Sequence, residues 1–161
     1  MADLVQRTID WMPTAPVVVE ASREMPVSAA AAFAVVADHE RWPEWFTSLK
    51  RVEVTGAPTG VGGRRRVHLR GVQVDEVFIG WETDRLFAFT LTQTSRPMAR
   101  SLVEAVRVEP LGDTRCRVTY TQAIEPLGWM KPLFAVARRP VRRMLTRALE
   151  GLERAAASRP G

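Results

Sequence analysis

The chain contains a single cysteine and two histidines among its 161 residues. Cys116 cannot form an internal disulfide, so the sequence is typical of a protein that folds in a reducing compartment, and we expect a cytoplasmic location. His39 and His68 fall in different segments, and neither a CxxC pair nor an HExxH motif occurs. These absences argue against a dedicated metal site, and we expect neither a metal nor a cofactor.

Long apolar runs and the common catalytic signatures are also missing. The first 15 residues carry Asp3 and Asp10 and no continuous apolar run, so they are neither a secretory signal nor a membrane span. Neither GxSxG nor GxGxxG occurs. The glycine-rich stretch "GAPTGVGG" lacks the GK[ST] ending of a phosphate-binding loop, so we expect it to be a hairpin loop.

The composition, 46% hydrophobic and 25% charged, is that of one globular domain with a core of its own. We place that domain at residues 16–157, after an N-terminal extension (1–15) and before a disordered tail (158–161). The net charge of +5 is uneven, because residues 126–161 hold eight basic and two acidic residues. Any anionic partner would therefore meet this segment.

The first half of the domain begins with a strand and a helix. The β-branched residues of 16–26 predict a strand that ends at Pro26. Ser28 is a natural N-cap for the alanine-rich helix that follows. We expect Pro43 to end this helix or to bend it into a second short one.

From Lys50 onward, six alternating apolar segments separated by turn signals predict an antiparallel meander. From Trp129 the spacing becomes helical, with an apolar stripe at Phe134, Ala137, Val141, Leu145, Ala148 and Leu152. We expect a kink or a break near Arg139, because Pro140 cannot donate a backbone hydrogen bond.

Four segments in this order resemble one known fold. They are "FAVVADHERWPEW", "GWETDRLFAF", "VRVEPLGDTRCRVTYT" and the closing arginine-rich helix. The chain resembles the START-like or SRPBCC superfamily, in particular its polyketide cyclase/dehydrase branch. The resemblance implies an α+β helix-grip fold, in which a seven-stranded curved antiparallel sheet surrounds a long C-terminal helix, with two short helices after the first strand. It also implies a hydrophobic cavity that accepts a lipid, a polyketide or a similar ligand.

Alternation along the strands indicates which side chains face such a cavity, since a curved sheet cannot lie flush on a straight helix. The stretch "DHERWPEWF" (residues 38–46), in the region of the two short helices, mixes aromatic and charged residues, which is typical of the mouth of a pocket. The candidate ligand-binding residues are Trp42, Phe46, Phe87, Phe89, Leu91, Gln93, Glu104, Tyr120, Gln122 and Met144.

Some of these candidates have plainer explanations. A buried carboxylate at Glu104 would be costly and would have a raised pKa, but a bulge could leave it in solvent or paired with Arg100 or Arg107. Tyr120 could be a core aromatic or could orient ligand. Trp45 is more consistent with packing than with ligand contact.

Three function classes follow. The first is a binder of a hydrophobic small molecule, and the second is a cyclase/dehydrase-type enzyme that acts on such a ligand, although no catalytic motif is identified. The third is a membrane-surface or RNA/protein interaction module that uses the basic C-terminal helix. An anionic membrane would contact Arg138, Arg139, Arg142, Arg143 and Arg147. We do not expect nucleic acid, because Arg64, Arg66, His68 and Arg70 form a row typical of a solvated outer sheet face.

Overall fold

The computed structural model describes residues 1–159, which form one antiparallel sheet with helices on both of its faces. The strands follow the order β2-β8-β7-β6-β5-β4-β3, and β1 pairs with β6. The strands are β1 (Ala2–Asp3), β2 (Val17–Met25), β3 (Leu49–Val54), β4 (Arg64–Leu69), β5 (Val72–Glu82), β6 (Leu86–Thr94), β7 (Ala99–Pro110) and β8 (Cys116–Pro126). The α-helices are α1 (Ala29–Ala37) and α2 (Lys131–Ser158), and the 3-10 helices are η1 (Ile9–Thr14), η2 (His39–Glu44) and η3 (Gly128–Met130).

The predicted order of one strand, two short helices, six strands and a long helix is confirmed. The Oγ atom of Ser28 accepts a hydrogen bond from the backbone nitrogen of Ala31 at 3.0 Å, which caps α1. Pro43 lies inside η2, a 3-10 turn that replaces any continuation of α1. The glycine-rich stretch connects β3 to β4, so it is the expected hairpin loop.

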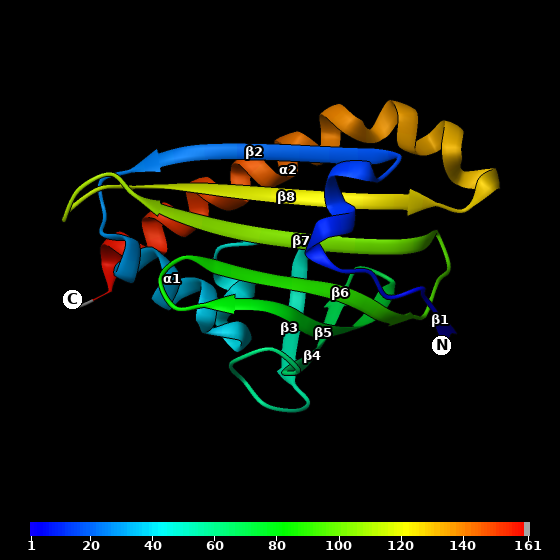
Figure 1. The fold of residues 1–161 in the computed structure, drawn as a ribbon, viewed down its shortest axis with the longest axis horizontal. Coiled ribbons are helices and arrows are strands. Elements are labelled where there is room, and N and C mark those ends of the chain that lie inside the picture. Colours follow the sequence, from blue (N-terminus) through cyan, green and yellow to red (C-terminus); the bar gives the residue numbers. More distant parts are fainter. Residues whose placement is uncertain (160–161) are drawn as a thin grey trace.

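Helix α2 crosses one face of the sheet, behind the strands in Figure 1. Its C-terminal half is buried at Leu145, Ala148, Leu149, Leu152 and Ala156, whereas Phe134, Val141 and Met144 in its N-terminal half are only partly buried. The helix continues through Pro140, so of the predicted kink or break the break does not occur. Within residues 1–159, no helix combines the length and apolarity that crossing a bilayer requires.

The N-terminal extension packs on the opposite face of the sheet, where η1 lies in front of the strands in Figure 1. Met12 of η1 closes a second apolar cluster formed by Leu86, Ala88, Val103, Ala105 and Ala123. Beyond β1, the backbone nitrogen of Leu4 donates to the oxygen of Thr92 at 2.9 Å. The packing of this extension was not predicted, because its short apolar segments show neither the period of a strand nor that of a helix.

Residues 158–161 were predicted to be a disordered tail. The last two of them, 160 and 161, lie outside the described residues. Ser158 ends α2. The Arg159 side chain donates to the backbone oxygen of Ala34 at 3.3 Å and to the Asp38 carboxylate at 3.1 Å.

Gly151 sets how closely α2 approaches η2. A Cβ atom at this position would overlap the backbone oxygen of Trp45, and backbone cannot rotate away as a side chain can. We expect Gly151→Ala to lower the free energy of unfolding by about 1–3 kcal/mol through overpacking. This would outweigh the gain of roughly 0.5–1 kcal/mol that alanine usually brings to a helix.

Urea denaturation would measure the effect, with Thr146→Ala as the control. Thr146 lies on the exposed side of the same helix, so alanine there should stabilise slightly. Equal stabilisation by both substitutions would contradict the proposed close approach.

Candidate ligand-binding cavity

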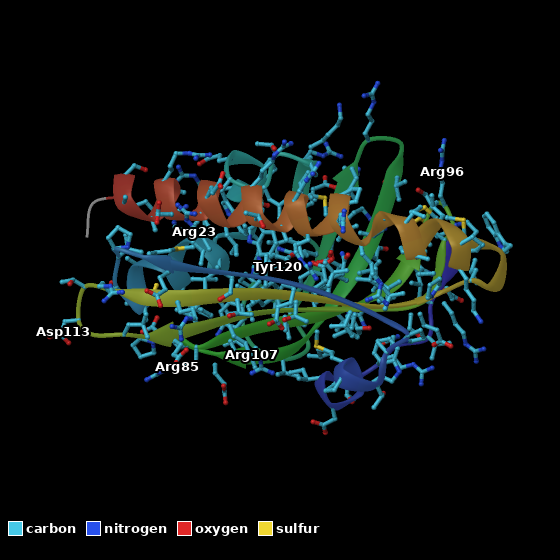
Figure 2. All side chains as sticks on the ribbon, turned by 90° about the horizontal axis from the view of Figure 1, so that it is seen from above. Arg23, Arg85, Arg96, Arg107, Asp113 and Tyr120 are labelled. Carbon is cyan, nitrogen blue, oxygen red and sulfur yellow. The ribbon has the colours of Figure 1, made fainter. Side chains whose placement is uncertain are left out.

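A cavity of about 420 Å³ lies between the sheet and the N-terminal half of α2, where the helix is only partly buried. Its walls are apolar: Val67, Val74, Leu91 and Ile124 come from the sheet, and Phe134 and Met144 come from α2. Tyr120 of β8 lies between the sheet and the helix (Figure 2). The structure therefore holds a preformed apolar space at the position that the fold predicts.

One end of the cavity is closed by a buried ion pair. The Nε atom of Arg65 lies 2.6 Å from Oε2 of Glu76, and these residues are only 1% and 4% exposed. The Arg65 guanidinium carbon lies 4.0 Å from the ring centre of Trp42 and 4.7 Å from that of Phe89. Aromatic faces and one carboxylate thus compensate a charge that burial would otherwise make costly.

His39 contacts the guanidinium of Arg65 at a second nitrogen. Its Nδ1 atom lies 3.2 Å from Nη1 of Arg65, and its Nε2 atom lies 2.9 Å from the backbone oxygen of Pro58. The neutral ring satisfies both contacts when Nε2 donates and Nδ1 accepts. Burial and the adjacent Arg65 charge lower the pKa of His39 to about 3, so the ring is neutral at physiological pH.

Glu104 points into the cavity beside this pair. The hydroxyl of Tyr120 donates to Oε2 of Glu104, and Nε2 of Gln122 donates to Oε1 at 2.5 Å. The register of β7 and β8 places these groups together, because Glu104 pairs with Gln122 and Val106 pairs with Tyr120. Burial raises the pKa of the Glu104 carboxyl, and the two hydrogen bonds oppose that shift. Burial and the Glu104 charge raise the pKa of Tyr120, so its hydroxyl remains a donor.

We call Arg65, Glu76, Glu104, Tyr120 and Gln122 the polar floor. It contains two carboxylates and one guanidinium. Burial raises the pKa of Glu76 to about 7, since desolvation outweighs the attraction of Arg65 and the Glu104 charge adds repulsion. The floor can therefore hold a proton near neutral pH. Among residues 1–159, no three His, Cys, Asp or Glu side chains are grouped so that they could hold a metal ion.

The exposed residues of the lining mark where the cavity opens. They are Ser48, Arg70, Arg96 and Met98. A second hollow of about 370 Å³ lies next to this lining, between residues 46–48 and the α2 residues Pro140, Arg143, Met144, Arg147 and Ala148.

Residues 16–157 match the sequence profile of the family described as "Polyketide cyclase / dehydrase and lipid transport". The chain belongs to this family. An uncharacterised protein of Mycobacterium tuberculosis is 32% identical over 148 residues, which cover 91% of this chain and 88% of that protein.

Two solved structures show the same helix-grip fold. A START superfamily protein from Mycobacterium smegmatis has a TM-score of 0.64 at 18% identity, covering 86% of this chain and 92% of that one. The di-domain ARO/CYC protein BexL of the BE-7585A biosynthetic pathway has a TM-score of 0.71 at 18% identity, covering 88% of this chain and 46% of that one. The predicted membership of the START-like superfamily and its fold are confirmed.

The structure places most of the predicted ligand-binding side chains in the lining of the cavity. These are Trp42, Phe46, Phe89, Leu91, Glu104, Tyr120, Gln122 and Met144. Glu104 faces inward, and its partners are Tyr120 and Gln122 rather than Arg100 or Arg107. Whether these side chains contact a ligand stays a prediction.

Two predicted residues do not line the cavity. Phe87 points inward, but its ring is enclosed by His39, Phe78 and Trp81 at centroid distances of 5.1, 4.9 and 5.7 Å, so it belongs to the solid core. Gln93 is turned away and donates to Asp3 at 2.8 Å. A bulge between Leu91 and Gln93 reverses the alternation, and the buried lining residue is Thr94 instead.

The mixed stretch in η2 has a different explanation from the predicted pocket mouth. Trp42 is 1% exposed and donates from Nε1 to the backbone oxygen of Val36 at 2.8 Å. It therefore belongs to the interior of the cavity. Trp45 is buried but does not line the cavity, as expected for packing. Arg41 and Glu44 form an exposed ion pair at 2.8 Å on the outer side.

The sequence reasoning missed Arg65 and Glu76, although alternation contained the signal. Arg65 shares a strand face with Val67 and Leu69, and Glu76 shares one with Val74 and Phe78. An arginine and a glutamate in inward rows on neighbouring strands predict a pair, and the register sets Arg65 opposite Glu76. His39 had no such signal, because its contacts come from a distant loop.

The raised pKa of Glu76 makes stability depend on pH. Because the folded protein binds this proton more tightly than the unfolded chain does, the carboxyl stabilises the fold fully below its ordinary pKa of 4.5. That contribution is lost as the pH rises through about 7. The free energy of unfolding of the wild type, minus that of Glu76→Gln, should therefore fall between these pH values and stay level above them.

Urea denaturation of both proteins across this pH range would measure the difference. His39 contributes the opposite slope, since its lowered pKa favours the fold above 6.5 and loses that effect as the pH falls toward 3. The histidine is present in both proteins, so its contribution cancels. A difference that does not change with pH would mean that Glu76 stays ionised beside Arg65.

Proposed function

We propose that this protein binds a hydrophobic small molecule, such as a lipid or a polyketide, in the cavity between its sheet and α2. The observation that carries this proposal is a preformed space of about 420 Å³ with apolar walls and a localised polar floor. Such a site supplies affinity from the walls and orientation from the floor. The lone buried cysteine, Cys116, supports the further proposal of a cytoplasmic location.

An enzyme of the cyclase/dehydrase type is the second candidate. The family description and the likeness to the ARO/CYC protein BexL support it. Glu76 also supports it, because a carboxyl with a pKa of about 7 suits a general acid or base at neutral pH. In such a reaction the apolar walls would fold the substrate chain while Glu76 or Glu104 moved a proton.

Filling the cavity tests the binding proposal. Leu91 and Leu86 lie on the same strand and are both 7% exposed, but Leu91 lines the cavity and Leu86 belongs to the opposite apolar cluster. Leu91→Trp should weaken binding of the neutral fluorescent probe N-phenyl-1-naphthylamine about tenfold or more, with little loss of stability, because the ring enters empty space.

Leu86→Trp is the matched control. It should lower the free energy of unfolding by about 1–3 kcal/mol through overpacking and leave probe affinity unchanged. Fluorescence titration and urea denaturation measure the two quantities. If the wild type does not bind the probe, or if both variants bind it equally, the cavity is not the binding site.

The exposed side chains of η3 and of the N-terminal half of α2 support a second role, docking on an anionic membrane surface. Trp129, Leu133 and Val136 are 72%, 54% and 73% exposed, an unusual set of large apolar side chains on one short segment. Leu127, which precedes them, donates its backbone N–H to the oxygen of Met98 at the opening of the cavity. Figure 2 shows Arg96 at the same end of the molecule.

Charge complementarity favours a bilayer as the partner. Residues 127–149 contain no acidic residue, and Lys131, Arg138, Arg139, Arg142, Arg143 and Arg147 are all exposed. Exposed tryptophan and aliphatic groups enter the interfacial region, while each nearby arginine adds about 1 kcal/mol on anionic lipid. Docking there would bring the opening of the cavity to the lipid surface.

Co-sedimentation with vesicles tests this role. The wild type should bind phosphatidylserine-containing vesicles and not pure phosphatidylcholine, and binding should weaken as salt is raised. Trp129→Ala and Arg139→Glu with Arg143→Glu should each reduce it severalfold. Arg154→Glu, an exposed change near the far end of α2, is the control. Absence of binding at low salt would leave these arginines as a solubilising surface.

A further inference from the structure

We propose that the cavity selects an apolar ligand whose buried end donates hydrogen bonds, most favourably a protonated amine, over a ligand whose buried end is a carboxylate. This inference rests on the proposed binding function, because it specifies the chemistry of the ligand in that same cavity. It concerns the polar floor, whose two carboxylates keep open acceptor positions and outnumber its one guanidinium.

Four donor atoms of the floor already have partners, although Arg65 and Gln122 carry further N–H groups. The Tyr120 hydroxyl and one N–H of Gln122 donate to Glu104, and Nε and Nη1 of Arg65 contact Glu76 and His39. Each carboxylate oxygen carries two lone pairs, so the two oxygens of Glu104 can each accept one further hydrogen bond after binding Tyr120 and Gln122. Glu76 and Glu104 both line the cavity, where a ligand can reach them. A ligand group that donates therefore finds acceptors without breaking existing bonds.

The charges of the floor lead to the same chemistry. Arg65 balances one carboxylate, and neutral His39 adds no charge beside it. The second carboxylate remains unbalanced when both are ionised, which a low-dielectric cavity disfavours. A protonated amine supplies the missing positive charge through charge-assisted hydrogen bonds. A ligand carboxylate at the same place would be a third negative group beside Glu76 and Glu104.

The exposed arginines of the opening do not reverse this selection. Arg70 and Arg96 could attract a ligand carboxylate, but they lie at the solvent-exposed part of the lining. A ligand held there by its acid end would press its apolar end against the polar floor. The floor would then lose solvation without gaining partners, which carries a desolvation penalty.

Three ligands that share one apolar body test the proposal. They are 2-(2-naphthyl)ethylamine, 2-(2-naphthyl)ethanol and 2-naphthylacetic acid, measured by isothermal titration at pH 7.5. We expect the amine to bind most tightly and the acid most weakly, with about a tenfold or larger difference between these two.

Two variants locate the preference. Glu104→Gln should reduce the preference for the amine over the alcohol about tenfold, because the amide keeps the shape of the side chain and removes its charge. If Glu104→Gln folds poorly, the same preference is measured with Glu76→Gln. The control is Glu125→Gln, which removes a carboxylate that pairs with Arg7 at 3.0 Å and does not line the cavity.

The outcomes separate this inference from the function on which it rests. Equal binding of all three ligands would overturn the selection and leave the binding function intact. Tightest binding of the acid, unchanged by Glu104→Gln, would overturn it in favour of an acid held at Arg70 and Arg96. Binding of none of the three, together with failure of the neutral probe to bind, would overturn the proposed function itself.

Discussion

The burial of Arg65 is the constraint around which the interior of this protein is arranged. A guanidinium is always charged at physiological pH, so the fold has to surround it with partners. Glu76 supplies a countercharge at 2.6 Å, and the ring of Trp42 lies 4.0 Å from the guanidinium carbon. His39 remains neutral and accepts a hydrogen bond from Arg65 at Nδ1, while its Nε2 donates to the backbone oxygen of Pro58 in the loop between β3 and β4.

This arrangement explains why an apolar cavity has a polar floor. Buried ion pairs seldom stabilise a fold more than well-packed apolar residues of similar volume would. The floor also carries Glu104, whose carboxylate is held by Tyr120 and Gln122 instead of by a cation. Groups of this kind are costly in an interior that binds nothing and useful in one that orients a ligand. We therefore interpret the floor as the functional part of the cavity and its walls as the source of affinity.

The fold was predictable from the sequence because it depends on short-range patterns. Ser28 caps α1, alternation defines β3 to β8, and four segments in order resemble a known superfamily. The family match of residues 16–157 confirms that resemblance. The packing of the extension and of α2 against the sheet depends instead on long-range contacts, such as those of Met12 and Gly151.

The site was predictable only where alternation continued without interruption. Glu104, Tyr120 and Gln122 were found in this way, whereas the bulge before Gln93 reversed the pattern, and bulges leave little trace in a single sequence. Arg65 and Glu76 had a signal in their strand positions, but a charged residue in an inward row is ordinarily attributed to a register error. Only the three-dimensional contacts show that the two charges are paired.

The most direct test of this account uses a variant in which apolar residues of similar size replace the Arg65–Glu76 ion pair. The free energy of unfolding of Arg65→Met with Glu76→Leu would be measured with and without saturating 2-(2-naphthyl)ethylamine, so that one experiment reports both stability and binding. The account predicts that the double variant is at least as stable as the wild type without ligand and is still stabilised by the amine, because Glu104 remains as the unbalanced carboxylate. A double variant that is strongly destabilised, or that is no longer stabilised by the amine, would contradict it.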